Sequence, residues 1–149
     1  MTREEKILLF KDLCARLPYH VRVKVWLEDG DTEEGPLDLQ HNYGDVLLDA
    51  FYYKKITKIK PYLRPMSSMT EEEQKVFSDI ESEFLETLVK KVQQIKDDNE
   101  RRHLLQKAVA KRTSEMVQFY NKSHFDYNGL IEKGLALEAP DGMYNTKTE

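Results

Sequence analysis

The sequence is poor in cysteine, in glycine and in long hydrophobic runs, and each shortage excludes a class of protein. Cys14 is the only cysteine among 149 residues, so no internal disulfide can form, as is usual in a reducing compartment. The six glycines form neither a dinucleotide-binding nor a P-loop fingerprint. No apolar run approaches the roughly 20 residues of a membrane span, and the first residues lack the apolar stretch of a signal peptide. We therefore expect a cytoplasmic protein without membrane contact.

Metal-binding and catalytic patterns are also missing. The four histidines, His20, His41, His103 and His124, are scattered, and none has a second histidine three or four residues away. The segment 29–40 begins like a calcium loop but has no glycine at its sixth position and no glutamate at its twelfth. No serine lies in a nucleophile elbow. We predict no metal, no cofactor and no catalytic residue, and a protein that is not an enzyme.

Charged residues are abundant, at 34%, and unevenly distributed. Residues 66–100 carry ten acidic and four basic side chains, whereas residues 101–122 carry one acidic and six basic ones. The net charge of −4 gives no overall attraction to nucleic acid, although local basic patches remain compatible with it.

The first 65 residues predict a helix followed by a small β-module. Thr2 and Glu5 form a capping box, and apolar residues then recur at helical spacing until Pro18: Ile7, Phe10, Leu13, Cys14 and Leu17. We interpret Cys14 as a core residue rather than a reactive thiol.

From His20 the hydrophobic period changes to two, which indicates a strand ending at Leu27. The Asp29-Gly30 pair predicts a type I′ hairpin turn, and Thr32–Leu39 a return strand that Gly35 and Pro36 weaken. A second turn, 41–45, precedes strands at 46–53 and 56–60. The predicted fold class is α+β: a small, strongly curved antiparallel sheet or SH3-like barrel, flanked by an N-terminal helix and a C-terminal helical section.

The chain after Met66 predicts helices. Thr70 and Glu73 form a second capping box, apolar residues recur to Ile95, and a second helix follows a break at Asp97-Asp98-Asn99. These helices could form an intramolecular hairpin or a coiled-coil dimer, and we favour the hairpin because the stripe covers about three heptads. We expect three parts: residues 1–65, the helical section 66–138 with a last short helix from Asp126 to Lys133, and a flexible tail, 139–149.

Two surfaces are candidate binding sites. Basic and aromatic residues of the β-module could bind phosphates by charge and bases by stacking; they are Arg22, Lys24, Trp26, Tyr53, Lys54, Lys58, Lys60 and Arg64. These lysines could instead protect the sheet edges, and eight carboxylates between Glu28 and Asp49 could neutralise them.

The second candidate surface is an apolar stripe on the helical section, formed by Phe77, Phe84, Leu88 and Val92. It could contact a protein partner or a second copy of the chain. Our prediction is a binding or adaptor module for an unknown protein partner, monomeric or weakly dimeric, with nucleic-acid binding as the alternative.

Three sequence blocks carry a family resemblance. They are KDLCARLPY at 11–19, KPYLRPMSSMTEEE at 60–73, and HFDYNGLIEKGLA at 124–136 followed by APDGMY at 139–144. Together they resemble a family of uncharacterised proteins from Bacteroides-type gut bacteria and their phages or prophages. The resemblance implies an origin in a bacterium or a mobile element, and it implies no activity. His20 and Asn128 depart from the family, which usually has glycine and often has arginine at these positions.

The closest approach to a catalytic cluster is His124, Asp126 and Tyr127. His124 could act as a general base oriented by Asp126. We favour a structural interpretation, in which Asp126 caps the last helix and Tyr127 packs.

Overall fold

The computed structural model describes residues 1–38 and 42–144, which form two compact units. The first, here the sheet unit, contains residues 1–66 and the segment from Asn121 onward. The second, here the hairpin unit, contains residues 67–120. The sequence analysis placed residues 121–138 with the helices, whereas in the structure they belong with the sheet.

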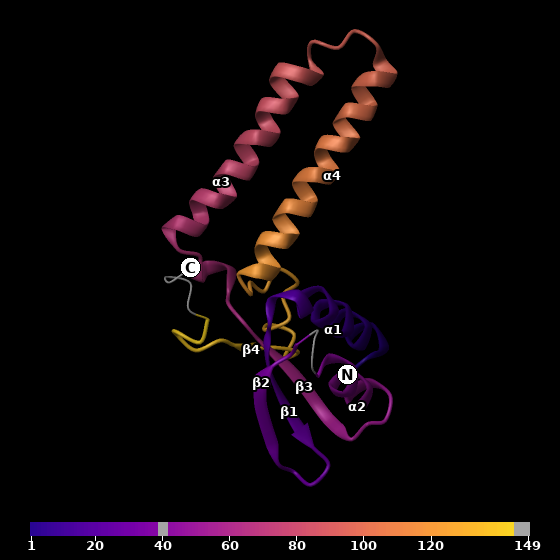
Figure 1. Ribbon diagram of the computed structural model, residues 1–149, viewed down its shortest axis with the longest axis vertical. Helices are drawn as coiled ribbons and strands as arrows, with labels where there is room; N and C mark the ends of the chain where they lie inside the picture. Colours follow the sequence, from indigo (N-terminus) through magenta and orange to yellow (C-terminus); the bar gives the residue numbers. More distant parts are fainter. Residues whose placement is uncertain (39–41, 145–149) are drawn as a thin grey trace. The chain divides into compact units, whose positions relative to one another are not determined.

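The sheet unit begins with helix α1, Arg3–Arg16, which starts at the predicted capping box (Figure 1). The Thr2 hydroxyl accepts the Glu5 N–H at 3.1 Å, and the Glu5 carboxylate accepts the Thr2 N–H at 2.8 Å. The buried side of α1 differs from the predicted one, because Ile7 and Phe10 are exposed. Its buried residues are Leu9, Asp12, Leu13 and Arg16. A 3-10 turn, η1 (Leu17–Tyr19), then leads into the sheet.

The sheet has four strands, β1 (Arg22–Leu27), β2 (Thr32–Pro36), β3 (Ile56–Leu63) and β4 (Leu137–Glu138), in the order β2-β1-β3-β4. The β1–β2 and β1–β3 pairs are antiparallel, and β4 is parallel to β3. Because β2 and β4 are both edge strands, the sheet is open, and the expected barrel is wrong.

The β1–β2 turn contains the predicted Asp29-Gly30 pair but is not of type I′. The Gly30 N–H donates to the Leu27 carbonyl at 3.0 Å, and Gly30 has φ +90°. Glu28 and Asp29 are not among the residues with positive φ, which a type I′ turn requires. The geometry is that of a type I turn followed by a left-handed glycine, which adds one loop residue and so sets the β1–β2 register.

The predicted strand at 46–53 is wrong, because residues 46–51 lie in helix α2, Tyr43–Phe51, and Tyr52 and Tyr53 lie in the turn after it. Its valine, leucine and aromatic residues favour strands. However, Tyr43, Val46, Leu47, Ala50 and Phe51 also follow the spacing i, i+3, i+4, i+7 and i+8 of a helix. Leu47 is buried, and Val46, Ala50 and Phe51 pack against the same core. Core packing therefore overrides strand propensity here. Leu39, the end of the predicted return strand, and His41, the start of the second predicted turn, lie outside the described residues.

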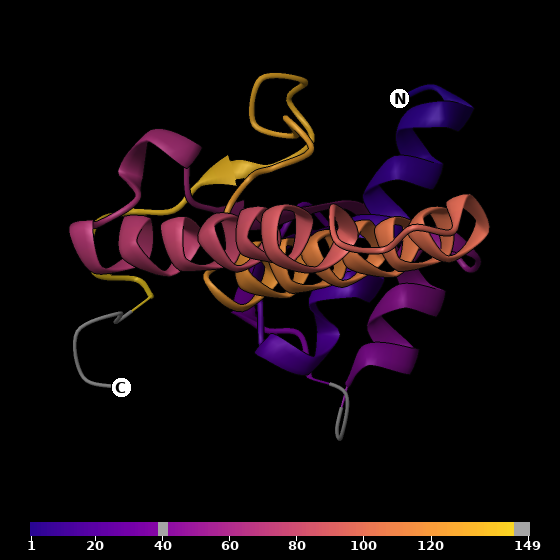
Figure 2. The same cartoon turned by 90° about the horizontal axis from the view of Figure 1, so that it is seen from above.

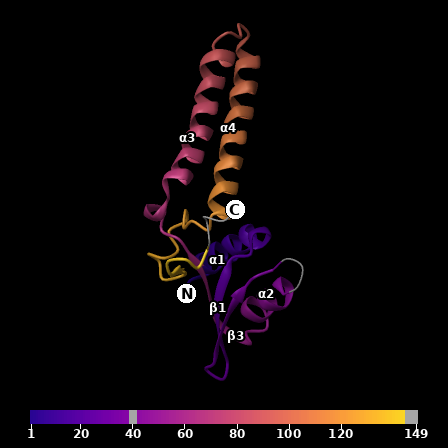
Figure 3. The same ribbon diagram turned by 60° about the vertical axis from the view of Figure 1, so that its left-hand side comes forward.

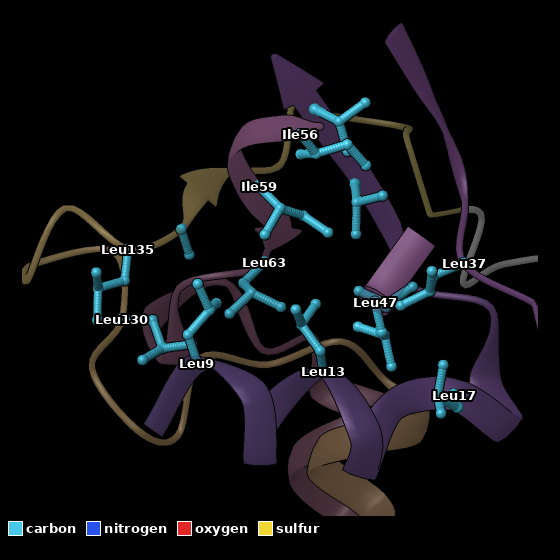
Figure 4. Close-up of a cluster of buried hydrophobic side chains, with 14 residues drawn as sticks. Leu9, Leu13, Leu17, Leu37, Leu47, Ile56, Ile59, Leu63, Leu130 and Leu135 are labelled. Atoms are coloured by element: carbon cyan, nitrogen blue, oxygen red, sulfur yellow. The ribbon is translucent and has the colours of Figure 1, made fainter. Parts of the chain in front are cut away.

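The core of the sheet unit lies where α1, α2 and the C-terminal segment meet one face of the sheet (Figures 1 and 3). Side chains from α1, β3 and α2 point toward one another there, together with those of Leu37, Leu130 and Leu135 (Figure 4). Leu13, Leu37, Leu63 and Leu130 are fully buried. The opposite face of β1 and β3 carries their polar residues.

The segment from Asn121 to Tyr144 contains no helix between Asp126 and Lys133, so the predicted last helix is wrong. Asp126 nevertheless binds backbone donors as a cap does, accepting the N–H groups of Leu130 at 2.7 Å and Ile131 at 3.0 Å. Gly134 has the predicted left-handed conformation, φ +73°. Of the predicted flexible tail, 139–149, residues 145–149 lie outside the described residues. Residues 139–144 are held to the sheet, because the Ala139 N–H donates to the Leu63 carbonyl at 2.8 Å and the Tyr144 hydroxyl binds backbone groups of Arg22 and Tyr62.

The hairpin unit consists of α3 (Glu71–Glu86), the π-helical turn η3 (Thr87–Val92) and α4 (Asp98–Lys122), whose last two residues belong to the sheet unit. A short 3-10 turn, η2 (Met66–Ser68), precedes α3. The predicted capping box of Thr70 and Glu73 starts α3. Helices α3 and α4 run side by side in opposite directions (Figures 1 and 2), which gives the intramolecular hairpin that we favoured.

Two further features concern the described part of the chain. None of its helices is both long and apolar enough to span a membrane. Within residues 1–38 and 42–144, no group of three histidine, cysteine, aspartate or glutamate side chains is placed to hold a metal ion.

Candidate nucleic-acid interface

The polar face of the sheet gathers the basic residues of β1 and β3. Alternation along β1 places Arg22, Lys24 and Trp26 on the side away from the core. The antiparallel register sets Lys24 opposite Lys60 and Trp26 opposite Lys58. These five residues, here the basic sheet face, come from both ends of the predicted module and meet only through strand pairing.

A β-bulge keeps this face in phase along β3. Trp26 pairs with Lys58, but Leu27 pairs with Ile56, so Thr57 is an extra residue on β3. The Thr57 hydroxyl donates to the Trp26 carbonyl at 3.1 Å. Because of this extra residue, Ile56 turns into the core while Lys58 and Lys60 stay on the outer face. In the sequence, the buried Ile56 and Ile59 are three residues apart instead of two, and this spacing is the signal of the bulge.

Trp26 is the centre of the basic sheet face. The Lys58 Nζ atom lies 4.7 Å from the centroid of its ring, and the Lys24 Nζ atom lies 5.3 Å from it. Both distances are in the range of cation–π contacts. Trp26 is half-buried and Lys58 is exposed, so the indole and the ammonium groups remain within reach of a ligand.

Glu34 on β2 is the acidic member of this surface, and the sequence analysis did not single it out. It pairs with Lys24 in the β1–β2 register, and its Oε1 lies 3.6 Å from the Lys24 Nζ atom. The same oxygen accepts the Tyr62 hydroxyl at 2.7 Å. Burial and this bond raise the pKa of Tyr62. Only the geometry of the β1–β2 turn could have predicted that Glu34 lies beside Lys24, because this turn sets the register of the two strands.

Three of the predicted patch residues lie elsewhere. Tyr53 and Lys54 are exposed in the turn between α2 and β3, outside either strand, and Lys54 has a left-handed conformation, φ +60°. The strand predicted at 46–53 would bring both residues to the patch, but the structure has α2 and a turn there. Arg64 follows β3 and is engaged in folding: its Nη1 donates to the Ser123 carbonyl at 3.2 Å, and its guanidinium lies over the Phe125 ring.

The predicted apolar stripe is used within the hairpin unit. Phe77, Phe84, Leu88 and Val92 are all half-buried. Phe84 faces α4 across a cavity of about 250 Å³ that Leu104 and Ala108 also line, and the Arg112 guanidinium lies 5.6 Å from the Phe84 ring centroid. Phe84 therefore lies at the seam between the two helices.

Residues of all three blocks of the family resemblance meet inside the sheet unit, although the second block continues into the hairpin unit after Met66. Arg16 and Asp12 form a buried ion pair on α1, with 2.8 Å between Nε and Oδ2. Arg16 also donates to the Phe125 carbonyl at 2.6 Å, and Asn128 donates to Asp12 at 3.0 Å. Sequence spacing could have found the pair, since Asp12 and Arg16 are opposite charges four residues apart beside Leu13.

The second contact between blocks involves Tyr144. Its hydroxyl donates to the Tyr62 carbonyl at 2.7 Å and accepts the Arg22 N–H at 2.9 Å. Its ring stacks on the His124 ring with 3.7 Å between centroids. Burial raises the pKa of Tyr144 to about 12. These bonds hold the C-terminal segment against β1 and β3, so the residues of all three blocks serve the fold.

His124 lies in the same buried region. Burial and, to a smaller extent, the nearby charges of Arg16 and Arg64 together lower the pKa of His124 to about 4. The imidazole is therefore neutral at pH 7. The Asp126 carboxylate accepts backbone N–H groups of Leu130 and Ile131, the capping role that we favoured over orientation of His124.

A scan against models of protein families finds none that matches this chain, and searches of curated proteins and of solved structures find no match either. The resemblance of the three blocks to a Bacteroides and phage family stays a prediction.

Proposed function

We propose that this protein is a non-catalytic binding module whose basic sheet face binds single-stranded nucleic acid. The observation that carries the proposal is the position of Trp26 beside the ammonium groups of Lys24 and Lys58, at 5.3 and 4.7 Å from its ring centroid. Proteins that bind single strands combine cations, which contact phosphates, with an aromatic ring on which a base stacks.

The geometry favours a single strand over a duplex. The basic sheet face is built from extended strands, and no helix of the sheet unit carries its residues. Direct readout of a duplex commonly places a helix in the major groove, whereas an open sheet bearing an aromatic residue suits unstacked bases. A base that stacks on Trp26 displaces a lysine ammonium, whose flexible chain then reaches a neighbouring phosphate.

The strength of binding follows from the charges. Arg22, Lys58 and Lys60 are the cations of this face that make no ion pair with Glu34, whereas Lys24 lies close to that carboxylate. Three phosphate contacts on a single strand give a slope of about −2 in log affinity against log salt. We therefore expect micromolar affinity at low salt and little binding at high salt. We propose a cytoplasmic location for this function, with origin in a bacterium or its phage as the resemblance implies.

Fluorescence polarisation with labelled oligo(dT), oligo(rU) and a mixed-sequence duplex, across a salt series, tests the proposal. The wild-type chain should bind the single strands with the stated slope. Lys58→Ala should reduce the magnitude of the slope by about 0.7, and Trp26→Ala should weaken binding by about tenfold through lost stacking. Lys11→Ala is the matched control, because this lysine is exposed on α1, away from both strands.

Glu34→Gln sharpens the test by predicting a gain. The amide retains an acceptor for the Tyr62 hydroxyl and removes the charge beside Lys24, so affinity should rise by about threefold. No binding at low salt, or equal losses in the Lys58 and Lys11 variants, would show that this face is not a nucleic-acid site. Tighter binding to the duplex than to the single strands would contradict the proposed ligand.

A further inference from the structure

The hairpin unit leaves a set of aliphatic side chains exposed. Within residues 67–120, all of which the structure describes, Met116 alone is buried. The exposed fractions are 56% for Leu85, 57% for Val89, 39% for Leu105 and 44% for Val109. Because two helices alone bury little apolar surface, such a hairpin gains stability when a further layer covers it.

These four residues lie at matching heights on the two helices. The Lys111 Nζ atom lies 2.6 Å from Glu83, so residues 83 and 111 are level. Leu85 lies two residues after Glu83 on α3, and Val109 lies two residues before Lys111 on α4. Leu85 is therefore level with Val109. Val89 lies six residues after Glu83, and Leu105 lies six residues before Lys111, so these two residues are level as well.

They also lie on one side of the hairpin. Phe84 and Ala108 line the same pocket between α3 and α4, which places both at the seam. Leu85 and Val109 each follow a seam residue by one position, which is a rotation of about 100° about each helix axis. Since the helices run in opposite directions, the two rotations carry both side chains to the same side. We call Leu85, Val89, Leu105 and Val109 the aliphatic face.

The opposite side of the hairpin is charged. Glu83 and Lys107 precede the seam residues by one position, and Lys111 pairs with both Glu83 and Glu115. This side is therefore charged and solvated. The other side offers aliphatic groups and, next to the seam, the half-buried Glu81–Arg112 ion pair. This asymmetry distinguishes the aliphatic face from scattered surface leucines.

We infer that the aliphatic face is an interface between two copies of this chain. Residues 71–92 carry seven acidic and three basic side chains, whereas α4 carries three acidic and six basic ones. A two-fold axis parallel to the helices lays α3 of one copy over α4 of the other, so opposite charges face each other across the interface. Rotation about this axis does not change the position of a residue along the helices. Leu85 of each copy therefore contacts Val109 of the other copy, which makes the interface self-complementary.

The expected dimer is weak. Residues 71–92 span about 33 Å at 1.5 Å per residue, and two adjacent helices are about 20 Å wide. One face then covers about 600 Å² per copy, which is near the lower limit for specific interfaces. We expect dissociation in the micromolar range.

Sedimentation velocity and light scattering on the full chain, from about 1 to 500 μM, test this inference. The wild type should change from monomer to dimer within this range, and added salt should weaken the dimer because opposite charges meet. Leu85→Glu should raise the dissociation constant by tenfold or more, because it buries an unpaired charge twice per dimer. Val76→Glu is the matched control: Val76 is also exposed on α3 but precedes the seam residue Phe77 and lies on the other side.

Cross-linking identifies the register. Leu85→Cys and Val109→Cys chains, mixed and treated with a short bis-maleimide, should form a mixed dimer that neither variant forms alone. A strict monomer at 500 μM, equal weakening by Val76→Glu and Leu85→Glu, or cross-linking of Leu85→Cys to itself would overturn the proposed interface. Circular dichroism of each variant verifies that the exposed substitutions leave the helices folded.

Discussion

Helices α1 and α3 begin with the same capping box and then use their side chains differently. Four residues of α1 are buried, including the oppositely charged Asp12 and Arg16, whereas α3 buries none. Ion pairs show the same contrast. The side chains of Asp12 and Arg16 are 0% exposed, whereas those of Lys111 and Glu83 are 60% and 57% exposed. The comparison teaches that a helix start is a local property, whereas burial depends on the layers that the rest of the chain provides.

The difference also separates two kinds of surface. The sheet unit completes its own core and presents charged and aromatic groups on its outer face. The hairpin unit has little core and presents aliphatic groups instead. We therefore propose a different occupant for each surface: an anionic chain for the sheet, and a second copy for the hairpin.

The buried ion pair should give the largest effect. Asp12→Ala leaves the Arg16 guanidinium buried without its carboxylate and removes the bond from Asn128, so the free energy of unfolding should fall by about 3–5 kcal/mol. Urea unfolding followed by fluorescence of Trp26, the only tryptophan, reports on the sheet unit. Glu83→Ala breaks an exposed pair and should leave this curve nearly unchanged. Equal losses of unfolding free energy in Asp12→Ala and Glu83→Ala would contradict the proposed difference between the buried and the exposed ion pair.

Acid should destabilise the sheet unit through His124. The pKa of His124 is about 4 in the folded chain and about 6.5 when unfolded, so the unfolded state takes up the proton first as the pH falls. Stability supplied by the neutral imidazole is complete above pH 6.5 and is lost progressively toward pH 4, by about 3 kcal/mol.

Unfolding curves at several pH values, compared with those of His124→Phe, measure this contribution. The phenyl ring retains stacking on Tyr144 but cannot titrate, so the variant should lose less stability between pH 6.5 and 4. His103→Gln, on exposed α4, is the matched control and should follow the wild-type profile. Identical pH profiles for the His124 variant and the wild type would contradict the assignment.

Backbone capping by aspartate should give the smallest effect. Asp126→Ala releases two half-buried N–H groups, of Leu130 and Ile131, and should lower the free energy of unfolding by about 1–2 kcal/mol. Asp97→Ala releases the exposed Glu100 N–H in the hairpin unit. Hydrogen exchange should accelerate around Glu100 in that variant without any change in the Trp26 unfolding curve. A shift of that curve by Asp97→Ala would show that the two units unfold together.

Local chemistry was predictable from the sequence. Both capping boxes, the β1 strand with its alternating valines, the left-handed Gly134 and the carboxylate role of Asp126 depend on groups within a few residues of one another. The basic residues of β1 and β3 were recognised for the same reason, as alternation alone places Arg22, Lys24 and Trp26 on one side.

Other features depended on partners distant in the chain, and only the tertiary structure decided them. The segment 43–51 is a helix because Leu47 packs into a core shared with α1 and β3, although its composition favours a strand. Arg64 leaves the basic patch because its partners, Ser123 and Phe125, lie about 60 residues later. The sequence by itself determined where α1 and α3 begin and which residues carry charge. The fold decided which of these residues meet, because burial and strand register depend on contacts that no local pattern contains.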